Sequence, residues 1–126
     1  MWSKLRVLVV DDDAFSRAVV VDILHDLGVK DVFEAGDATV ALQSVARFQP
    51  DLILSDIHMD PISGIAFVRH LRSAPNPAIA SVRVIFMTGD SSKETLGAAL
   101  PLGIRGYLIK PPSSEAVKSK IEIAMR

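Results

Sequence analysis

Short apolar runs alternate along the chain with longer segments in which apolar residues recur every three or four positions. The short runs are rich in branched aliphatic and aromatic residues, which favour β-strands. They predict five strands, at residues 5–10, 31–35, 51–55, 82–87 and 104–109. The first, third and fourth runs are almost continuously apolar, a pattern typical of strands buried on both faces of a parallel sheet.

The segments between these runs have helical periodicity. They predict five helices, at residues 14–27, 37–48, 64–73, 91–100 and 113–125. In the first helix, Val21 and Leu24 recur at helical spacing, and Gly28 is a typical residue after a helix end. The last helix begins near Ser113, a residue type favoured at helix starts. The stretch SAPNPAIAS is rich in turn-forming residues and is interpreted as a loop.

Strict alternation of strands and helices predicts the fold class. Parallel strands joined by helices cross over in the right-handed sense and form an α/β sheet covered on both faces. With five strands, we expect a flavodoxin-like, doubly wound parallel sheet of order 2-1-3-4-5. We find no internal repeat, and we expect residues 1–126 to form one domain.

Polar residues stand at the carboxyl end of four of the predicted strands. Asp11–Asp13 follow the first strand, Asp56 the third, Thr88 the fourth and Lys110 the fifth. In an open α/β sheet, ligands bind beyond the carboxyl ends of the strands, beside the point where the strand order reverses. The first and third strands are neighbours at that point, so we expect Asp56 to approach the first acidic run.

Several carboxylates brought together need a counter-charge. Oxygen ligands suit a hard divalent cation, so the acidic group predicts a Mg²⁺ or Mn²⁺ site. The Lys110 ammonium and the Thr88 hydroxyl would then converge on Asp56 with the cation. Such an arrangement stabilises negative charge that arrives on a carboxylate, as it does when an aspartate accepts a phosphoryl group.

Composition narrows the class of protein. The chain of 126 residues carries 14 Lys plus Arg and 15 Asp plus Glu, a net charge of −1 that indicates neither nucleic acid nor a membrane surface as a partner. It contains no cysteine, which excludes disulfides and thiolate chemistry. We find no signal peptide and no apolar stretch near the ~20 residues that span a bilayer. We therefore expect a soluble, cytoplasmic protein.

Four motifs also carry a family resemblance. VLVVDDD, DLILSDIHM, VIFMTGD and GYLIKP occur in the order and spacing of the receiver domains of bacterial response regulators, the phosphoacceptors of two-component phosphorelay systems. The resemblance covers nearly the whole chain. It implies that Asp56 is the phosphoacceptor and that Asp11 and Asp12 hold Mg²⁺ together with Asp56. It also implies that the backbone carbonyl of His58 is a further metal ligand.

The resemblance assigns further roles around Asp56. Thr88 matches the hydroxyl that closes onto the phosphoryl group, and Lys110 matches the lysine that pairs with it. Tyr107 stands at the position of the aromatic switch residue, although a half-buried strand aromatic is an equally good interpretation. His58 and Asp90 flank the path of an attacking water, so we expect them to tune how long the phosphoryl group survives.

Three further residues and one peptide bond are given structural roles. Lys110–Pro111 is a candidate cis peptide bond. Asp13 is expected only to cap the first helix or to stand in its first turn. His25 and His70 are assigned to helix surfaces.

The sequence departs from the receiver pattern at two places. After the phosphoacceptor the segment reads DIHMDPISG, with Asp60 where proline is usual and Pro61 one position later. Gly64 keeps its expected offset, so the loop keeps its length. Pro112 stands where a bulky apolar residue often follows, and we expect it to stiffen the entry to the last helix.

The resemblance also implies partners. The phosphodonor would be a sensor histidine kinase or a histidine phosphotransfer protein, and the chain would catalyse only its own phosphorylation and dephosphorylation. Output would pass through the face formed by the predicted helix 91–100, strand 104–109 and helix 113–125, which includes Arg105, Tyr107 and Lys118. A downstream target protein, an effector domain beyond the last helix, and a homodimer formed on phosphorylation all remain open.

Three alternatives belong to other classes. A haloacid-dehalogenase-like phosphatase would use Asp11 as nucleophile and Asp13 as acid/base, but Ala14 and Phe15 replace its usual small hydroxyl pattern. It would also need a second acidic pair after Lys110, which the sequence lacks. A flavodoxin-type cofactor binder would need a phosphate-cradling loop where three aspartates stand. A degenerate receiver acting only as a binding module disagrees with the complete set of aspartates, threonine and lysine.

Overall fold

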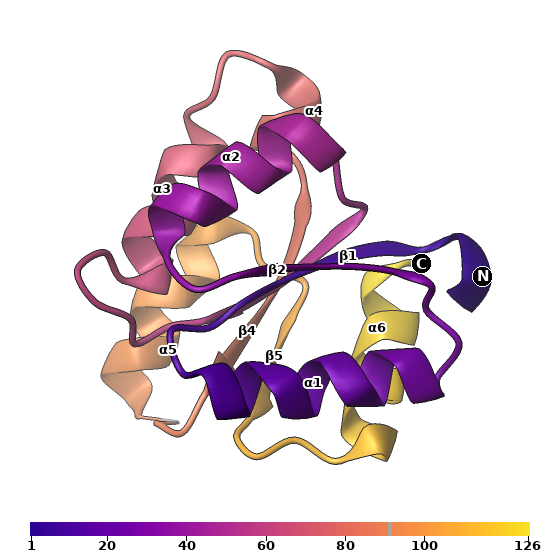
Figure 1. Ribbon diagram of the computed structural model, residues 1–126. Coiled ribbons are helices and arrows are strands. Elements are labelled where there is room, and N and C mark those ends of the chain that lie inside the picture. Colours follow the sequence, from indigo (N-terminus) through magenta and orange to yellow (C-terminus); the bar gives the residue numbers. More distant parts are fainter. Residues whose placement is uncertain (91) are drawn as a thin grey trace.

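A computed structural model describes residues 1–90 and 92–126, and its centre is one parallel sheet (Figure 1). The strand order is β2-β1-β3-β4-β5, which confirms the predicted flavodoxin-like arrangement. The strands are β1 (Arg6–Val10), β2 (Asp31–Ala35), β3 (Leu52–Asp56), β4 (Arg83–Thr88) and β5 (Gly106–Ile109). Each lies within two residues of the run that predicted it.

Helices connect the strands. They are α1 (Ala14–Asp26), α2 (Ala38–Phe48), α3 (Gly64–Arg72), α4 (Pro77–Ala80), α5 (Lys93–Ala99) and α6 (Ser114–Ala124), with 3-10 turns η1 (Trp2–Lys4) and η2 (Leu100–Leu102). Residue 91, at which one predicted helix begins, lies outside the described residues.

The segment interpreted as a loop contains the short helix α4, which the sequence analysis did not predict. Asn76 caps this helix, because its side chain accepts a hydrogen bond from the N–H of Ala78. Pro77 occupies the first helical position, where its fixed φ is favourable and a missing N–H costs nothing. The turn-forming residues that indicated a loop thus start one helical turn instead.

Side chains alternate across the sheet and divide the core into two layers. Val7 and Val9 pack on one face, which α1 and α6 cover, whereas Leu8 and Val10 pack on the face covered by α2, α3 and α5. Figure 1 shows α1 and α6 together on one side of the sheet and the other long helices opposite them. The three central strands are therefore buried on both faces, as their apolar runs predicted.

Strand register sets the position of the polar residues. Val10 of β1 lies level with Ser55 of β3, and Asp56 lies level with Met87 of β4. The segments that follow these strands consequently emerge at one edge of the sheet. Both termini lie toward the opposite edge, at the right in Figure 1. Within the described residues, each helix is too short or too polar to traverse a lipid bilayer.

Candidate functional site

The residues predicted at the strand ends meet at the carboxyl edge of the sheet. Asp11 directly follows β1, Asp56 ends β3, Thr88 ends β4 and Lys110 directly follows β5. Asp11, Asp56 and Thr88 are buried, and Lys110 is half-buried. Burial of two carboxylates side by side is costly unless cations compensate them. This edge of the sheet is therefore the candidate functional site.

Lys110 supplies that compensation. Its Nζ donates hydrogen bonds to Asp11 Oδ2 at 2.8 Å and to Asp56 Oδ2 at 3.2 Å. Burial lowers the pKa of Lys110, but its hydrogen bond to Asp11 and the negative charge of Asp56 outweigh that effect, and the net pKa is raised. The lysine is therefore held in its charged form between the two acids.

The two buried carboxylates differ in their pKa. Burial raises the pKa of Asp56, and the nearby charge of Asp11 raises it further, so its pKa stays above the ordinary value in spite of Lys110. Burial also opposes ionisation of Asp11, but hydrogen bonds from Lys110 and from the N–H of Asp13 prevail and lower its pKa. Asp11 therefore favours its ionised form. An additional cation would mainly stabilise the ionised form of Asp56.

Asp12 completes an acidic group with these two residues. One carboxylate oxygen from each of Asp11, Asp12 and Asp56 lies within 4.8 Å of the others. Asp12 is exposed, and its Oδ2 accepts a long hydrogen bond of 3.3 Å from the N–H of Asp60. Three carboxylates that converge from two strand ends fit a hard divalent cation such as Mg²⁺, which binds through carboxylates and waters.

The loop after Asp56 passes very close to the end of β3. A Cβ atom at Gly64 would overlap the carbonyl oxygen of Asp56, so glycine is required by this approach. The N–H of Gly64 donates to the carbonyl of Ile57 at 2.7 Å. The loop is thereby folded back over the site.

Two peptide bonds beside the site are cis. Lys110–Pro111 is cis, as the sequence predicted. Asp60–Pro61 is also cis, which was not expected from the sequence. These two bonds lie in the loops that carry Lys110 and Asp60 respectively.

Thr88 is engaged within its own loop. Its Oγ1 donates to the carbonyl of Asp90 at 3.0 Å and accepts from the N–H of Asp90 at 2.9 Å. The Asp90 carboxylate accepts hydrogen bonds from the N–H of Ser92 and the hydroxyl of Thr95, both at 2.9 Å, and these lower its pKa. His58 Nε2 lies 3.6 Å from Asp90 Oδ2, which links the loops after β3 and β4.

Tyr107 is a half-buried residue of the edge strand β5. It packs against the core on the α2, α3 and α5 face, and Lys120 Nζ lies 5.8 Å from the centre of its ring. This agrees with the strand-aromatic interpretation. The switch role stays a prediction.

The remaining expectations concern helix residues. Asp13 caps α1, because its Oδ1 accepts from the N–H groups of Phe15 and Ser16, which confirms the cap role. His25 and His70 are exposed on helices, as expected. Asp13 is also the residue that the phosphatase alternative would use as acid/base. Its carboxylate is instead hydrogen-bonded to the backbone of α1.

Sequence reasoning missed Arg17. Its Nη1 donates to the carbonyl of Asp11 at 2.7 Å and its Nε donates to Glu34 at 3.1 Å. The arginine thus fixes the turn after β1 against the end of β2. One sequence signal could have indicated Arg17: it is a cation in the first turn of the helix that follows the acidic run. Its hydrogen-bond partners could not have been predicted, because residue spacing does not show which way a long side chain extends.

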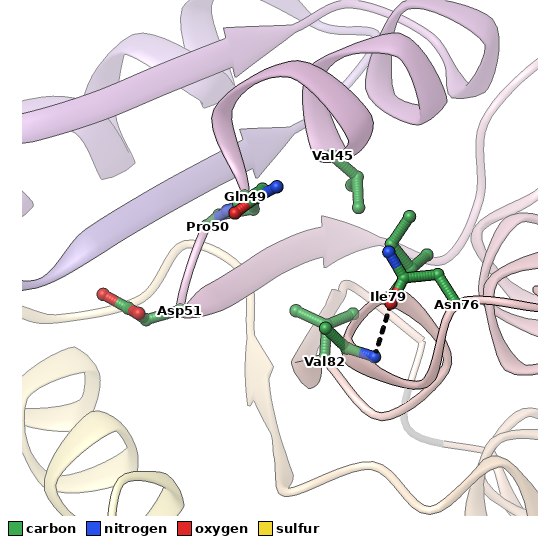
Figure 2. A pocket seen from close by; sticks show the side chains of 8 residues that line it. Val45, Gln49, Pro50, Asp51, Asn76, Ile79 and Val82 are labelled. Atoms are coloured by element: carbon green, nitrogen blue, oxygen red, sulfur yellow. Dashed lines mark hydrogen bonds between the residues drawn. The ribbon is translucent and has the colours of Figure 1, made fainter.

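A separate hollow lies at the other edge of the sheet. It has a volume of about 260 Å³ and lies between the end of α2, the turn before β3 and helix α4. Figure 2 shows Val45, Ile79 and Val82 grouped there, whereas Asp51 points away from them. No predicted site residue lines it. The predicted chemistry is thus confined to the carboxyl edge.

The chain is similar in sequence to known proteins of one family. The family model described as the response regulator receiver domain matches residues 7–122. The chemotaxis protein CheY of Pseudomonas aeruginosa is 29% identical over 118 residues, which cover 94% of this chain and 94% of that protein. A probable chemotaxis protein CheY of Rhizobium etli is 33% identical over 119 residues, covering 94% of this chain and 91% of that protein.

A solved structure has the same fold. The chemotaxis response regulator CheY4 of Vibrio cholerae matches with a TM-score of 0.85 at 28% identity, covering 95% of this chain and 98% of that chain.

Proposed function

This chain belongs to the response regulator receiver family, and from that premise we propose that Asp56 accepts a phosphoryl group and that its phosphorylation is the signalling event. One observation carries the proposal. Asp56 is buried at the end of β3, 3.2 Å from the Lys110 ammonium and beside Asp11 and Asp12. Its raised pKa reports a carboxylate whose charge is incompletely compensated, which favours binding of an additional cation there.

The chemistry is phosphoryl transfer from a phosphohistidine. A carboxylate oxygen of Asp56 forms a bond to phosphorus as the bond from phosphorus to the imidazole nitrogen breaks. The electron pair of that bond stays on the imidazole nitrogen. The imidazole then takes up a proton if its other nitrogen was not already protonated. Water later attacks the phosphorus of the acyl phosphate, which releases inorganic phosphate and restores the carboxylate. Such a reaction depends mainly on positioning and on charge stabilisation.

The acidic group fits a divalent cation. Asp11, Asp12 and Asp56 would hold Mg²⁺ or Mn²⁺ through carboxylate oxygens, and the backbone carbonyl of His58 would add a ligand. When bound, the ion neutralises the charge of the phosphoryl oxygens and orients them. Asp11 suits this role because its lowered pKa keeps it ionised.

Lys110 and Thr88 act on the phosphoryl group in this proposal. Lys110 already donates to Asp56 and to Asp11, so its ammonium can pair with a phosphoryl oxygen without leaving the site. Thr88 must exchange its hydrogen bond to the Asp90 carbonyl for one to a phosphoryl oxygen. That exchange moves the loop before α5, and Tyr107 in the adjacent strand β5 would change rotamer with it.

Membership of the receiver family also implies partners for the reaction. The phosphodonor is a sensor histidine kinase or a histidine phosphotransfer protein, and residues 1–126 act as one receiver domain. Output passes through the face formed by α5, β5 and α6, either to a target protein, to an effector domain or to a second copy of the chain. Phosphorylation biases an equilibrium between two states of this face.

The test uses acetyl phosphate with Mg²⁺ and intact-protein mass spectrometry. We expect the parent to gain the mass of one phosphoryl group, Asp56→Asn to gain none, and the exposed control Asp22→Asn to behave like the parent. Removal of Mg²⁺ with EDTA should abolish the gain in both the parent and Asp22→Asn. Phosphorylation retained in Asp56→Asn and lost in Asp11→Asn would instead identify Asp11 as the nucleophile, as in the phosphatase alternative.

A further inference from the structure

Acidic residues are absent from two long stretches of the chain. Residues 61–89 and 95–114 contain no aspartate or glutamate, although the whole chain has a net charge of −1. The first stretch contains Arg69, Arg72 and Arg83, and the second contains Arg105. The end of α3 and the starts of β4 and β5 therefore carry arginines and no carboxylate of their own.

Two of these arginines line one hollow. It has a volume of about 430 Å³ and lies between the end of α3, the turn after α4 and the η2–β5 loop. Arg72, the last residue of α3, lines it on one side, and Arg105, the residue directly before β5, lines it on the other. No carboxylate lines it. Among residues 1–90 and 92–126, neither guanidinium forms an ion pair with a carboxylate.

Arg72 is held rigidly in this hollow. Its Nε donates to the carbonyl of Leu102 at 2.7 Å, and its Nη1 donates to the carbonyls of Ala80 and Val82 at 3.0 and 2.8 Å. Carbonyl oxygens satisfy these donors without neutralising the charge. Burial, and after it the nearby charge of Arg105, lowers the pKa of Arg72. Its Nη2 makes no hydrogen bond within the described residues and remains available to a ligand.

We propose that this hollow binds a small phosphate-type oxyanion between Nη2 of Arg72 and the guanidinium of Arg105. Guanidinium groups bind tetrahedral oxyanions through paired charge-assisted hydrogen bonds. Since three carbonyls already orient Arg72, little side-chain entropy is lost when the anion binds. The anion also relieves the repulsion between the two arginines. It joins α3 to the η2–β5 loop and lies at the sheet edge opposite Asp56.

This site does not depend on the proposed phosphoacceptor chemistry, and its test leaves that chemistry out. Inorganic phosphate is titrated into the parent in EDTA, at slightly alkaline pH and at ionic strength held constant with chloride. Backbone amide shifts of Gly103 and Arg105 are followed by NMR. We expect these shifts to saturate, while the amides of Asp56 and Asp90 remain in place.

Two variants distinguish phosphate binding in this hollow from a general attraction of phosphate to a basic surface. Arg105→Gln should weaken phosphate binding about tenfold, the loss expected for one charge-assisted pair. Arg69→Gln removes the same charge from an exposed position of α3 and should leave the affinity unchanged. Arg105 suits the test because its side chain is exposed and makes no hydrogen bond within the described residues, so the variant should fold.

Three results would overturn the proposal. The first is a linear response to phosphate that chloride reproduces. The second is an equal loss of affinity in Arg105→Gln and Arg69→Gln. The third is saturation by acetate at the same concentration as phosphate, which would indicate a general carboxylate site and not one for a phosphate-type dianion.

Discussion

The Lys110 ammonium lies 3.2 Å from the Asp56 carboxylate, although 54 positions separate the two residues in the chain. The parallel sheet produces this contact, since β3 and β5 both end at the same edge with β4 between them. The same ammonium lies 2.8 Å from Asp11, so one cation serves two buried acids. The stability of this edge of the protein should therefore depend strongly on Lys110.

Lys110→Met keeps most of the aliphatic side chain but removes the charge. The variant leaves Asp11 and Asp56 adjacent without a protein cation, so we expect it to lower the free energy of unfolding by about 2 kcal/mol in EDTA. Urea denaturation measures the difference. Mg²⁺ should restore part of the loss by compensating the acids. Lys118→Met, an exposed residue of α6, is the control and should change stability little.

Asp56→Asn should stabilise the protein at neutral pH in EDTA. The pKa of Asp56 is raised above its ordinary 3.8 in the folded state, so its ionised form opposes folding. The parent then loses stability as the pH rises through the folded-state pKa, while the variant does not. We expect Asn to add roughly 1 kcal/mol at neutral pH. This advantage should shrink as the pH falls through the folded-state pKa and vanish below 3.8.

Urea denaturation of both proteins over a series of pH values checks this prediction. Mg²⁺ should reverse the order at neutral pH, because only the parent keeps all three carboxylates of the acidic group. An advantage of the variant that grew toward acidic pH would mean that the folded state lowers the pKa of Asp56 instead.

Much of the site could be predicted because strand burial leaves a strong pattern in sequence. The apolar runs of β1, β3 and β4 stop at the carboxyl edge of the sheet, so the polar residue that closes each run marks that edge, although that residue is itself buried. Once the strand order is known, the meeting of Asp11, Asp56 and Lys110 follows from topology. No knowledge of side-chain conformations is needed for this step.

Contacts that depend on side-chain paths could not be predicted. Arg17 reaches back to the carbonyl of Asp11, and the N–H of Asp60 reaches Asp12 across a loop. Helix α4 was missed because a single turn is too short to have periodicity. The bonds between Thr88 and Asp90 form within one turn whose residue types fit many loop conformations.

Gly64→Ala should destabilise the fold. A Cβ there would overlap the Asp56 carbonyl, which is backbone and cannot rotate away. We expect a loss of about 2–3 kcal/mol, typical of overpacking that moves the backbone. The matched control is Gly97→Ala in α5, where a Cβ meets open space, and it should add about 0.5–1 kcal/mol because alanine favours helices. Thermal and urea unfolding measure both. Equal effects would contradict the close approach of Gly64 to β3.

His58 and Asp90 should control the lifetime of the phosphorylated state more than metal binding. The two side chains lie 3.6 Å apart on the loops that follow β3 and β4, and both are exposed to water. In this position they can order or obstruct the water that attacks phosphorus. We expect His58→Ala and Asp90→Ala each to change the dephosphorylation rate several-fold, up to on the order of tenfold, a change of ~1.4 kcal/mol in barrier. Their Mg²⁺ affinities should stay within about twofold of the parent, since neither side chain belongs to the acidic group.

Asp90 has a second task, so its variant needs a control of its own. It accepts a hydrogen bond from Thr95, and its loss also loosens the start of α5. Thr95→Val removes that bond but keeps the Asp90 carboxylate, so it separates the two effects. A rate change in Asp90→Ala but not in Thr95→Val assigns the effect to the carboxylate near the attacking water. Half-lives equal to the parent in both His58→Ala and Asp90→Ala would show that neither residue reaches that water.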